Sequence, residues 1–301
     1  MDVAGRRFIG LPDLDVNHRL GAGREPRRRQ PGRVGRDQVG RVEVGIAAVT
    51  LFGVVVVGVA LEVTDAAELA ARLKDNGLQQ VLFNTPPGGN DVAGFDAAWA
   101  AGQRGTASVP GREAEFRAGF AQALDWAEAL ACPRIHAMVG LRAEGASAEA
   151  ADATLIGNLQ WAALEAAKAG RDVLVEPINT RSIPGFHLNR QDHAHRIVQA
   201  VGAPNVKVQM DLFHCQIVEG DLSAKIAQYL PTGHVGHIQI AEVPARHEPG
   251  SGEINWDHIF KTIDKVSAEC SWDGWIGCEY NPADASAGGT SRGLSWARGY
   301  L

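Results

Sequence analysis

The chain has 301 residues, 45% of them hydrophobic, which is enough to bury the core of one domain of about 250 residues. Its net charge of −6 is mild, so we expect neither a nucleic-acid partner nor binding to an anionic membrane. The four cysteines are far apart and form no CxxC pair, which favours a cytoplasmic location over a disulfide-stabilised secreted fold.

The first 62 residues differ in composition from the rest of the chain. Between Arg6 and Arg41 there are ten arginines and no lysine, without a helical or strand period. Residues 44–61 follow as an uncharged run that is long enough to span a membrane. Two other interpretations are a buried strand pair and an altered or misread start, and we favour the last. We therefore divide the chain into an atypical segment, 1–62, and a folded domain, 63–301, and expect no secretory signal or membrane anchor.

From residue 63 onward, the sequence shows a regular succession of helix and strand patterns. Thr64 or Asp65 is expected to cap a helix that Gly77 ends, and a short strand follows at 80–84. Residues 89–111 are predicted to be a long polar excursion of the kind used for lids and binding loops. Further helices are predicted at 113–130, 151–169, 191–201, 221–229 and 255–266. Strands are expected to begin near residues 80, 134, 173, 206, 235 and 274.

This alternation of strands and helices predicts an α/β fold with a parallel sheet. Six strand–helix units can be counted from residue 80, whereas a (β/α)8 TIM barrel needs eight, and only residues 1–62 remain to supply the other two. We therefore predict a (β/α)8 barrel whose first two strand units are atypical, replaced or missing. Missing strands would leave sheet edges unpaired and lower the stability of the fold.

Four of the predicted strands end on a side chain that offers an oxygen. These side chains are Glu176, Asp211, Gln239 and Glu279, with separations of 35, 28 and 40 residues. Because the carboxyl ends of barrel strands meet at one rim, we expect the four side chains to lie together. A set of oxygen ligands suits Mg²⁺ or Mn²⁺ better than zinc. The sequence thus predicts a divalent metal site.

Glu176 and Glu279 lie on well-separated strands, so they can flank a substrate carbon from opposite faces. A divalent metal that chelates a hydroxy-carbonyl group lowers the free energy of an enediolate. One carboxylate can then remove a proton from carbon while the other returns a proton to the neighbouring carbon. The pattern indicates aldose–ketose isomerisation or epimerisation.

Four further side chains are candidates for substrate binding. His214 lies three residues beyond Asp211 and is expected to donate a hydrogen bond just above the rim. Arg246 and His247 fall in the loop after the third of these strands, where an arginine can clamp a carboxylate. The alternative for Arg246 is a solvated loop charge. His136 ends its own strand and faces either the core or the rim. We expect a small hydroxy-carbonyl substrate that bears a carboxylate.

Several short motifs carry a resemblance to a known family. They are VLFNTPPG at 81–88, PGREAEF at 110–116, EPINTR at 176–181, IPGF at 183–186, QMDLFHCQ at 209–216, GHIQIA at 236–241, RHEP at 246–249 and GWIGCEY at 274–280. Together, over residues 65–301, the sequence resembles the hydroxypyruvate isomerase family of xylose-isomerase-like barrels. The resemblance implies interconversion of hydroxypyruvate and tartronate semialdehyde, in glyoxylate metabolism, with a divalent metal. It also implies that Glu176 and Glu279 transfer the proton and, with Asp211 and Gln239, bind the metal.

Two departures from the family leave alternatives open. Residues 1–62 lack the opening strand, helix and second strand of the family, and the loop at 89–108 is longer than usual. The alternatives are an isomerase or epimerase of a four-carbon 2-oxo acid or a ketose, a catalytically inactive barrel with a broken amino end, and a form tethered to a membrane by residues 44–61. Substrate length, metal identity and homo-oligomerisation are not decided by the sequence.

Overall fold

The computed structural model describes residues 48–50 and 65–299, except 287. Its strands are β1 (Ala48–Thr50), β2 (Phe83–Asn84), β3 (Arg134–His136), β4 (Asp172–Val175), β5 (Val206–Asp211), β6 (Val235–Ile240) and β7 (Ile276–Glu279). They form one sheet in the order β1-β7-β6-β5-β4-β3-β2, in which β2 to β7 are parallel and β1 is antiparallel to β7. The six parallel strands confirm the predicted strand–helix units.

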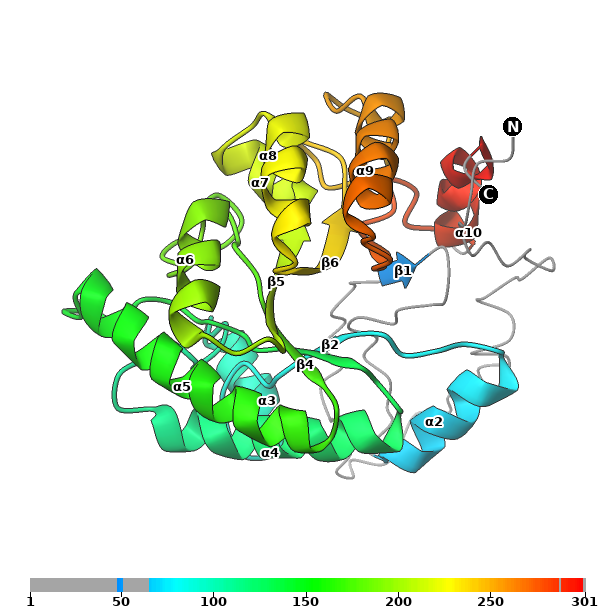
Figure 1. The fold of residues 1–301 in the computed structure, drawn as a ribbon. Coiled ribbons are helices and arrows are strands. Elements are labelled where there is room, and N and C mark those ends of the chain that lie inside the picture. Colours follow the sequence, from blue (N-terminus) through cyan, green and yellow to red (C-terminus); the bar gives the residue numbers. More distant parts are fainter. Residues whose placement is uncertain (1–47, 51–64, 287, 300–301) are drawn as a thin grey trace, which may run out of the picture.

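The helices lie around the outside of this curved sheet (Figure 1). They are α2 (Ala66–Asp75), α3 (Val92–Ala100), α4 (Glu113–Ala129), α5 (Ala148–Lys168), α6 (Gln191–Val201), α7 (Leu212–Val218), α8 (Leu222–Tyr229), α9 (Trp256–Cys270) and α10 (Gly289–Gly293), with 3-10 helices at Leu230–Thr232 and Leu294–Gly299. Asp65 caps α2 as predicted, because its side chain accepts a hydrogen bond from the Ala67 N–H at 2.8 Å. Gly202, with a φ of 72°, ends α6 in the left-handed conformation that glycine favours.

Residues 89–111, predicted as a long polar excursion, contain a helix, α3, that was not predicted. Asp91 caps this helix through its side chain. The rest of the excursion is held by Glu115, which accepts a hydrogen bond from the Gly89 N–H at 2.7 Å and pairs with Arg112 at 2.6 Å. The segment is therefore anchored to the start of α4.

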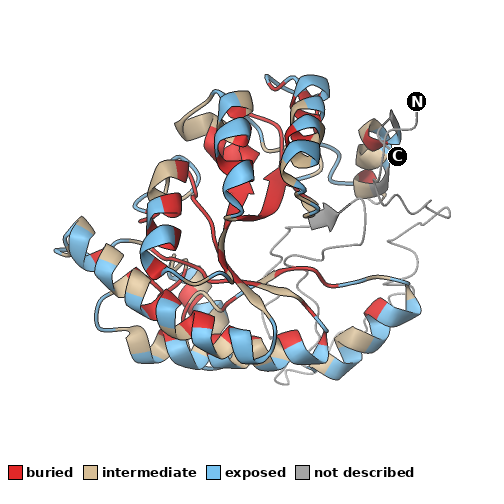
Figure 2. Cartoon of the chain, viewed as in Figure 1, coloured by how far each residue is buried: buried red, intermediate tan, exposed pale blue. Residues whose placement is uncertain are grey.

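The sheet is buried on both faces in its central part, as Figure 2 shows by the red strands behind the pale blue outer surfaces of the helices. Every residue of β6 is buried, which is typical of a parallel barrel strand. One apolar core joins α4, α5 and α6 to β3, β4 and the start of β5, with Phe120 and Leu159 fully buried in it. A second core joins α8 and α9 to β6 and β7. These two cores fix the strands whose ends carry the site.

The amino-terminal side of the sheet agrees with the prediction of atypical first units. In the described part of the chain, β2 pairs only with β3, and the other edge carries β1, with Ala48 opposite Glu279. A strand therefore forms within the uncharged run at 44–61. It is antiparallel to β7, whereas a barrel strand would run parallel to its neighbour. The remainder of residues 44–61, to which the alternative of a membrane tether refers, lies outside the described residues. Among the residues that are described, no helix is long and apolar enough to cross a membrane.

Candidate active site and metal centre

The structure places the four predicted oxygen ligands at the carboxyl ends of four neighbouring strands. Glu176 directly follows β4, Asp211 ends β5, Gln239 lies near the end of β6 and Glu279 ends β7. In the sheet register, Asp211 lies opposite Gln239, and Gln239 lies opposite Gly277 on the next strand. The structure thus brings the ends of these four strands to the same edge of the sheet.

Gln209 links two of these side chains, and sequence reasoning missed it. Its Nε2 donates to Glu176 Oε2 at 2.8 Å and to Gln239 Oε1 at 2.5 Å, and its side chain is buried. Gln209 lies two residues before Asp211, so strand alternation directs both side chains to the same face. The two-residue spacing of Gln209 and Asp211 is the sequence feature from which the position of Gln209 could have been predicted.

His214, in the first turn of α7, lies among the carboxylates. Its Nε2 is 3.7 Å from Glu176 Oε1 and 3.7 Å from Asp211 Oδ2. On the other side of the ring, Nδ1 is 2.5 Å from Asn179 Nδ2, while Asn179 Oδ1 accepts a hydrogen bond from the Ser182 N–H. Nδ1 is thus an acceptor, and burial lowers the pKa of His214 well below its usual value. The neutral ring must carry its proton on Nε2, which makes His214 a donor toward the rim, in line with its predicted role.

Asp211 is held by the helix that follows it. Its Oδ1 accepts hydrogen bonds from the backbone N–H groups of Phe213 at 2.7 Å and His214 at 3.2 Å. This arrangement leaves Oδ2 buried and without a hydrogen-bond partner, and the same is true of Glu176 Oε1. Two carboxylate oxygens are therefore available for a ligand at the rim.

Arg246 enters the same group of side chains from the loop between β6 and α9. Its Nη2 lies 3.1 Å from Glu279 Oε2 and 3.6 Å from Asp211 Oδ2, and its side chain is only 23% exposed. The alternative of a solvated loop charge is therefore wrong. The Arg246 backbone has a φ of 57°, and its N–H donates to the Glu242 carbonyl. The loop thus turns this side chain inward.

The two remaining candidate histidines differ in position. His136 is buried, with Nδ1 2.9 Å from Asn84 Oδ1 and 3.8 Å from Glu176 Oε2, so it faces the rim. Burial lowers the pKa of His136 to about 3, which keeps the ring neutral. His247 Nδ1 instead lies 2.8 Å from the backbone carbonyl of Asn281. Its described contact serves the loop and not the carboxylates.

Burial and mutual repulsion dominate the electrostatics of the site. Burial, followed by the charges of Glu279 and Asp211, raises the pKa of Glu176 well above its usual value. Burial also raises the pKa of Asp211 and of Glu279, while the charge of Arg246 opposes both shifts. Burial acts to lower the pKa of Arg246, but Glu279, Asp211 and Glu176 outweigh it and raise that pKa, so the guanidinium stays charged. Three buried carboxyl groups thus share one permanent cation.

These features fit a bound divalent metal ion. The site has an excess of buried acidic groups and two carboxylate oxygens without hydrogen-bond partners. Carboxylate and amide oxygens are the ligands that hard divalent cations prefer. Among the described residues, Glu176, Asp211 and His214 offer ligand atoms that lie within 4.8 Å of one another, and the predicted ligands Gln239 and Glu279 lie at the ends of the two neighbouring strands.

Glu242 is a further residue that sequence reasoning missed. It lies two residues after the end of β6 and is buried, and its two carboxylate oxygens accept four hydrogen bonds. The donors are the backbone N–H groups of Val243 (3.0 Å), Ile254 (3.0 Å) and Gly250 (2.9 Å) and the Nε1–H of Trp256 (2.8 Å). Glu242 thus holds together the loop that carries Arg246.

Replacing Glu242 with glutamine is expected to lower the free energy of unfolding by roughly 1–3 kcal/mol, because the new NH₂ group would face N–H donors that need an acceptor. Displacement of the loop should also move Arg246, which would weaken substrate binding and raise KM. Denaturant unfolding and steady-state kinetics measure the two effects. Glu253→Gln in the same loop is the matched control, since Glu253 is exposed and accepts one long hydrogen bond from Gln216. Equal behaviour of the two variants would contradict the role assigned to Glu242.

Comparison with known proteins gives matches over most of the chain. The model of the xylose isomerase-like TIM barrel family matches residues 42–300. The 2-oxo-tetronate isomerase of Cupriavidus necator is 49% identical over 236 residues, which cover 78% of this chain and 84% of that protein. The hydroxypyruvate isomerase of Escherichia coli is 42% identical over 236 residues, with the same two coverages.

Solved structures match as well. The crystal structure described as an AP endonuclease, family 2, from Brucella melitensis is 44% identical and has a TM-score of 0.69. The match covers 78% of this chain and 84% of that one. The range matched by the family model includes every residue placed at the rim.

Proposed function

Because this chain belongs to the xylose isomerase-like TIM barrel family, we propose that it is an isomerase that interconverts hydroxypyruvate and 2-hydroxy-3-oxopropanoate (tartronate semialdehyde). The observation that carries the proposal is the pair of glutamates in one cluster of carboxylates, Glu176, which is buried, and Glu279, whose side chain is 12% exposed. Relatives named as isomerases of two small acids, at 42% and 49% identity, support an isomerase of small hydroxy-oxo acids.

The two glutamates are suited to opposite roles in proton transfer. Glu279 lies 3.1 Å from the guanidinium of Arg246, which favours its charged form, and Glu176 Oε1 has no hydrogen-bond partner. Starting from hydroxypyruvate, one glutamate accepts a proton from carbon 3 and the other delivers one to carbon 2, while the hydroxyl proton passes from the oxygen on carbon 3 to the oxygen on carbon 2. The roles reverse in the other direction. The Nε2–H of His214 points to the same region and can donate to a substrate oxygen.

The ion that we propose for this site is Mg²⁺ or Mn²⁺, held by Glu176, Asp211, Gln239 and Glu279. When bound, it would polarise the carbonyl oxygen of the substrate and stabilise the negative charge that develops on it. Arg246 offers a planar guanidinium beside this position, which suits the carboxylate of a small acid. A neutral sugar has no carboxylate for this guanidinium to bind.

A four-carbon 2-oxo acid is the second candidate substrate. It is favoured by the 49% identity to the enzyme named 2-oxo-tetronate isomerase. Both acids present a carboxylate and a hydroxy-carbonyl group, and the four-carbon acid has one additional CHOH unit. A cytoplasmic location and the absence of a nucleic-acid partner are part of the proposal, and the former rests on the wide spacing of the four cysteines, which form no CxxC pair.

The test is a turnover assay on the full-length protein with hydroxypyruvate, 2-oxo-tetronate and a neutral ketose, each with Mg²⁺ or Mn²⁺. We expect turnover of at least one of the acids, with kcat/KM for the neutral ketose lower by roughly tenfold or more, since it lacks the charged group that Arg246 binds. Absence of turnover with both acids from folded protein would favour the inactive barrel.

Removing the metal with EDTA is expected to abolish turnover and to lower the melting temperature, because the buried carboxylates would lose the cation that offsets their repulsion. Thermal melts and the same assay measure both effects. Adding Mg²⁺ or Mn²⁺ back should restore turnover and the melting temperature. Turnover that EDTA leaves unchanged would contradict a metal-assisted reaction.

A further inference from the structure

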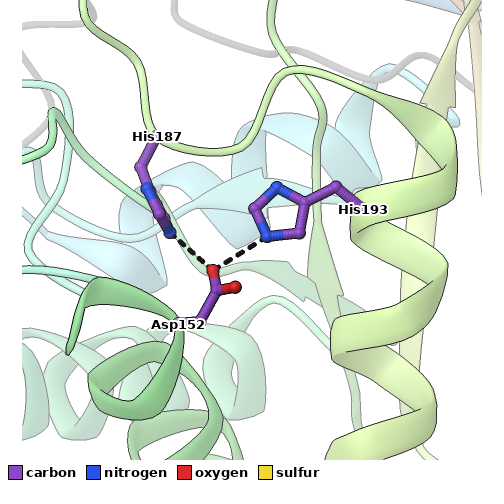
Figure 3. A group of neighbouring side chains, drawn as sticks. All are labelled: Asp152, His187 and His193. Carbon is purple, nitrogen blue, oxygen red and sulfur yellow. Dashed lines mark hydrogen bonds and ion pairs between the residues drawn. The ribbon is translucent and has the colours of Figure 1, made fainter. Parts of the chain in front are cut away.

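A second group of side chains with metal-ligating atoms lies on α5, on α6 and in the loop between β4 and α6. Asp152 is in α5, His187 is in the loop, and His193 is in the first turn of α6. The Nε2 atoms of both histidines lie 2.8 Å from Asp152 Oδ1. Figure 3 shows the two rings approaching this one oxygen from different sides.

The two imidazole rings are oriented so that their nitrogens converge. Their planes are 82° apart and their centroids are 5.5 Å apart, so the rings do not stack. The two Nε2 atoms and the carboxylate oxygen all lie within 4.8 Å of one another. Three ligand atoms from three elements of the fold thus surround one point.

These distances are close to those of a tetrahedral metal site. Zinc bonds of about 2.0–2.2 Å at tetrahedral angles place neighbouring ligand atoms roughly 3.3 Å apart. The nitrogen-to-oxygen distances of 2.8 Å therefore need to open by about half an ångström, and the two imidazole nitrogens, which lie within 4.8 Å of each other, need to settle at a similar separation by side-chain rotation. An entering ion would replace two N–H···O hydrogen bonds by three coordination bonds.

The surroundings leave a path for an ion. The His187 side chain is 2% exposed, whereas those of His193 and Asp152 are 17% and 34% exposed. The carboxylate side of the group is therefore open to solvent.

We propose that Asp152, His187 and His193 form a second metal site, for Zn²⁺ or another borderline transition-metal ion. Two imidazoles and one carboxylate suit such ions, while the oxygen ligands of the rim suit Mg²⁺ or Mn²⁺, so the two sites differ in metal preference. The ion would fasten the loop between β4 and α6 to both helices. That loop also carries Asn179, which orients His214 at the rim.

The experiment measures Zn²⁺ binding to the full-length protein with Mg²⁺ in excess, which keeps the oxygen-rich rim occupied. Metal-free protein is dialysed against Zn²⁺, and the bound metal is counted by mass spectrometry. His193→Gln and Asp152→Asn each remove one ligand atom from a partly exposed side chain. His258→Gln is the control, because His258 is an exposed histidine whose described side-chain partner is the Ser223 hydroxyl.

We expect the His193→Gln and Asp152→Asn variants to bind one equivalent of Zn²⁺ fewer than the wild type and the control, or to bind it roughly tenfold or more weakly. Zn²⁺ should also raise the melting temperature of the wild type and leave that of the two variants unchanged. Equal stoichiometry and affinity in wild type and both variants would overturn the proposal. Wild-type protein that binds no Zn²⁺ under these conditions would overturn it as well, and would leave the group as a hydrogen-bonded clamp.

Discussion

Replacing Glu176 with glutamine is expected to lower kcat by about 100- to 10,000-fold, because the amide can neither accept nor return the proton that moves between the two carbons. The same result is expected for Glu279→Gln. Both substitutions keep the size of the side chain and remove its titratable group. Steady-state kinetics with hydroxypyruvate and with 2-oxo-tetronate measure the effect.

The metal content of each variant shows whether turnover is lost because a base for proton transfer is missing or because a metal ligand is missing. If the variants retain the divalent ion of the rim and still lose turnover, the effect lies in proton transfer. Glu269→Gln, at an exposed position in the last turn of α9, is the matched control and should leave kcat unchanged. A Glu176→Gln enzyme with bound metal and near-normal kcat would contradict the role of this residue.

Replacing Arg246 with glutamine is expected to raise KM for both acids by roughly 10- to 150-fold, because a hydrogen bond to a charged group contributes about 1.5–3 kcal/mol. The charge of Arg246 also holds down the pKa values of Asp211, Glu279 and Glu176. Removing it raises those pKa values further, and a general base must be unprotonated to act. The acidic limb of the kcat/KM profile should therefore move to higher pH.

Arg196→Gln is the control for this substitution, since Arg196 is 64% exposed and pairs with Asp192 on the surface of α6. A neutral ketose provides a second comparison, because it lacks the carboxylate that Arg246 would bind. Equal losses for acidic and neutral substrates would contradict carboxylate recognition by Arg246. An unchanged pH profile would contradict its electrostatic role.

The placement of the rim residues was predictable because it depends on a rule of topology. Glu176, Asp211, Gln239 and Glu279 each end or follow an apolar strand, and parallel strands bring such ends together without any further information. The side chain of Arg246 was placed only as one of two alternatives. Its inward direction depends on the loop that Glu242 organises through four hydrogen bonds, and the sequence has no local signal for that set of contacts.

Other features could not be predicted because they join distant segments by tertiary contact. Asp152 and His187 belong to different elements, and no short motif relates them. The antiparallel pairing of β1 with β7 joins residues from opposite ends of the chain. Helix α3 was missed because its Ala- and Gly-rich segment lies between turn residues that indicated a loop.

The order of strands β4, β5, β6 and β7 in the sheet affects how fast the rim can assemble. Each of the first three pairs with the next strand along the chain, and the paired residues are only 27 to 38 positions apart in sequence, as in Val208 with Val235 and Ile238 with Ile276. Closing loops of this length costs little entropy, and each doubling of loop length adds only about 0.6 kcal/mol. All four oxygen ligands can thus be brought together by successive local steps, as the chain between Asp172 and Glu279 folds. Most of the chain separates β1 from β7, so their pairing is non-local and slow. We expect these two strands to pair after the rim has assembled.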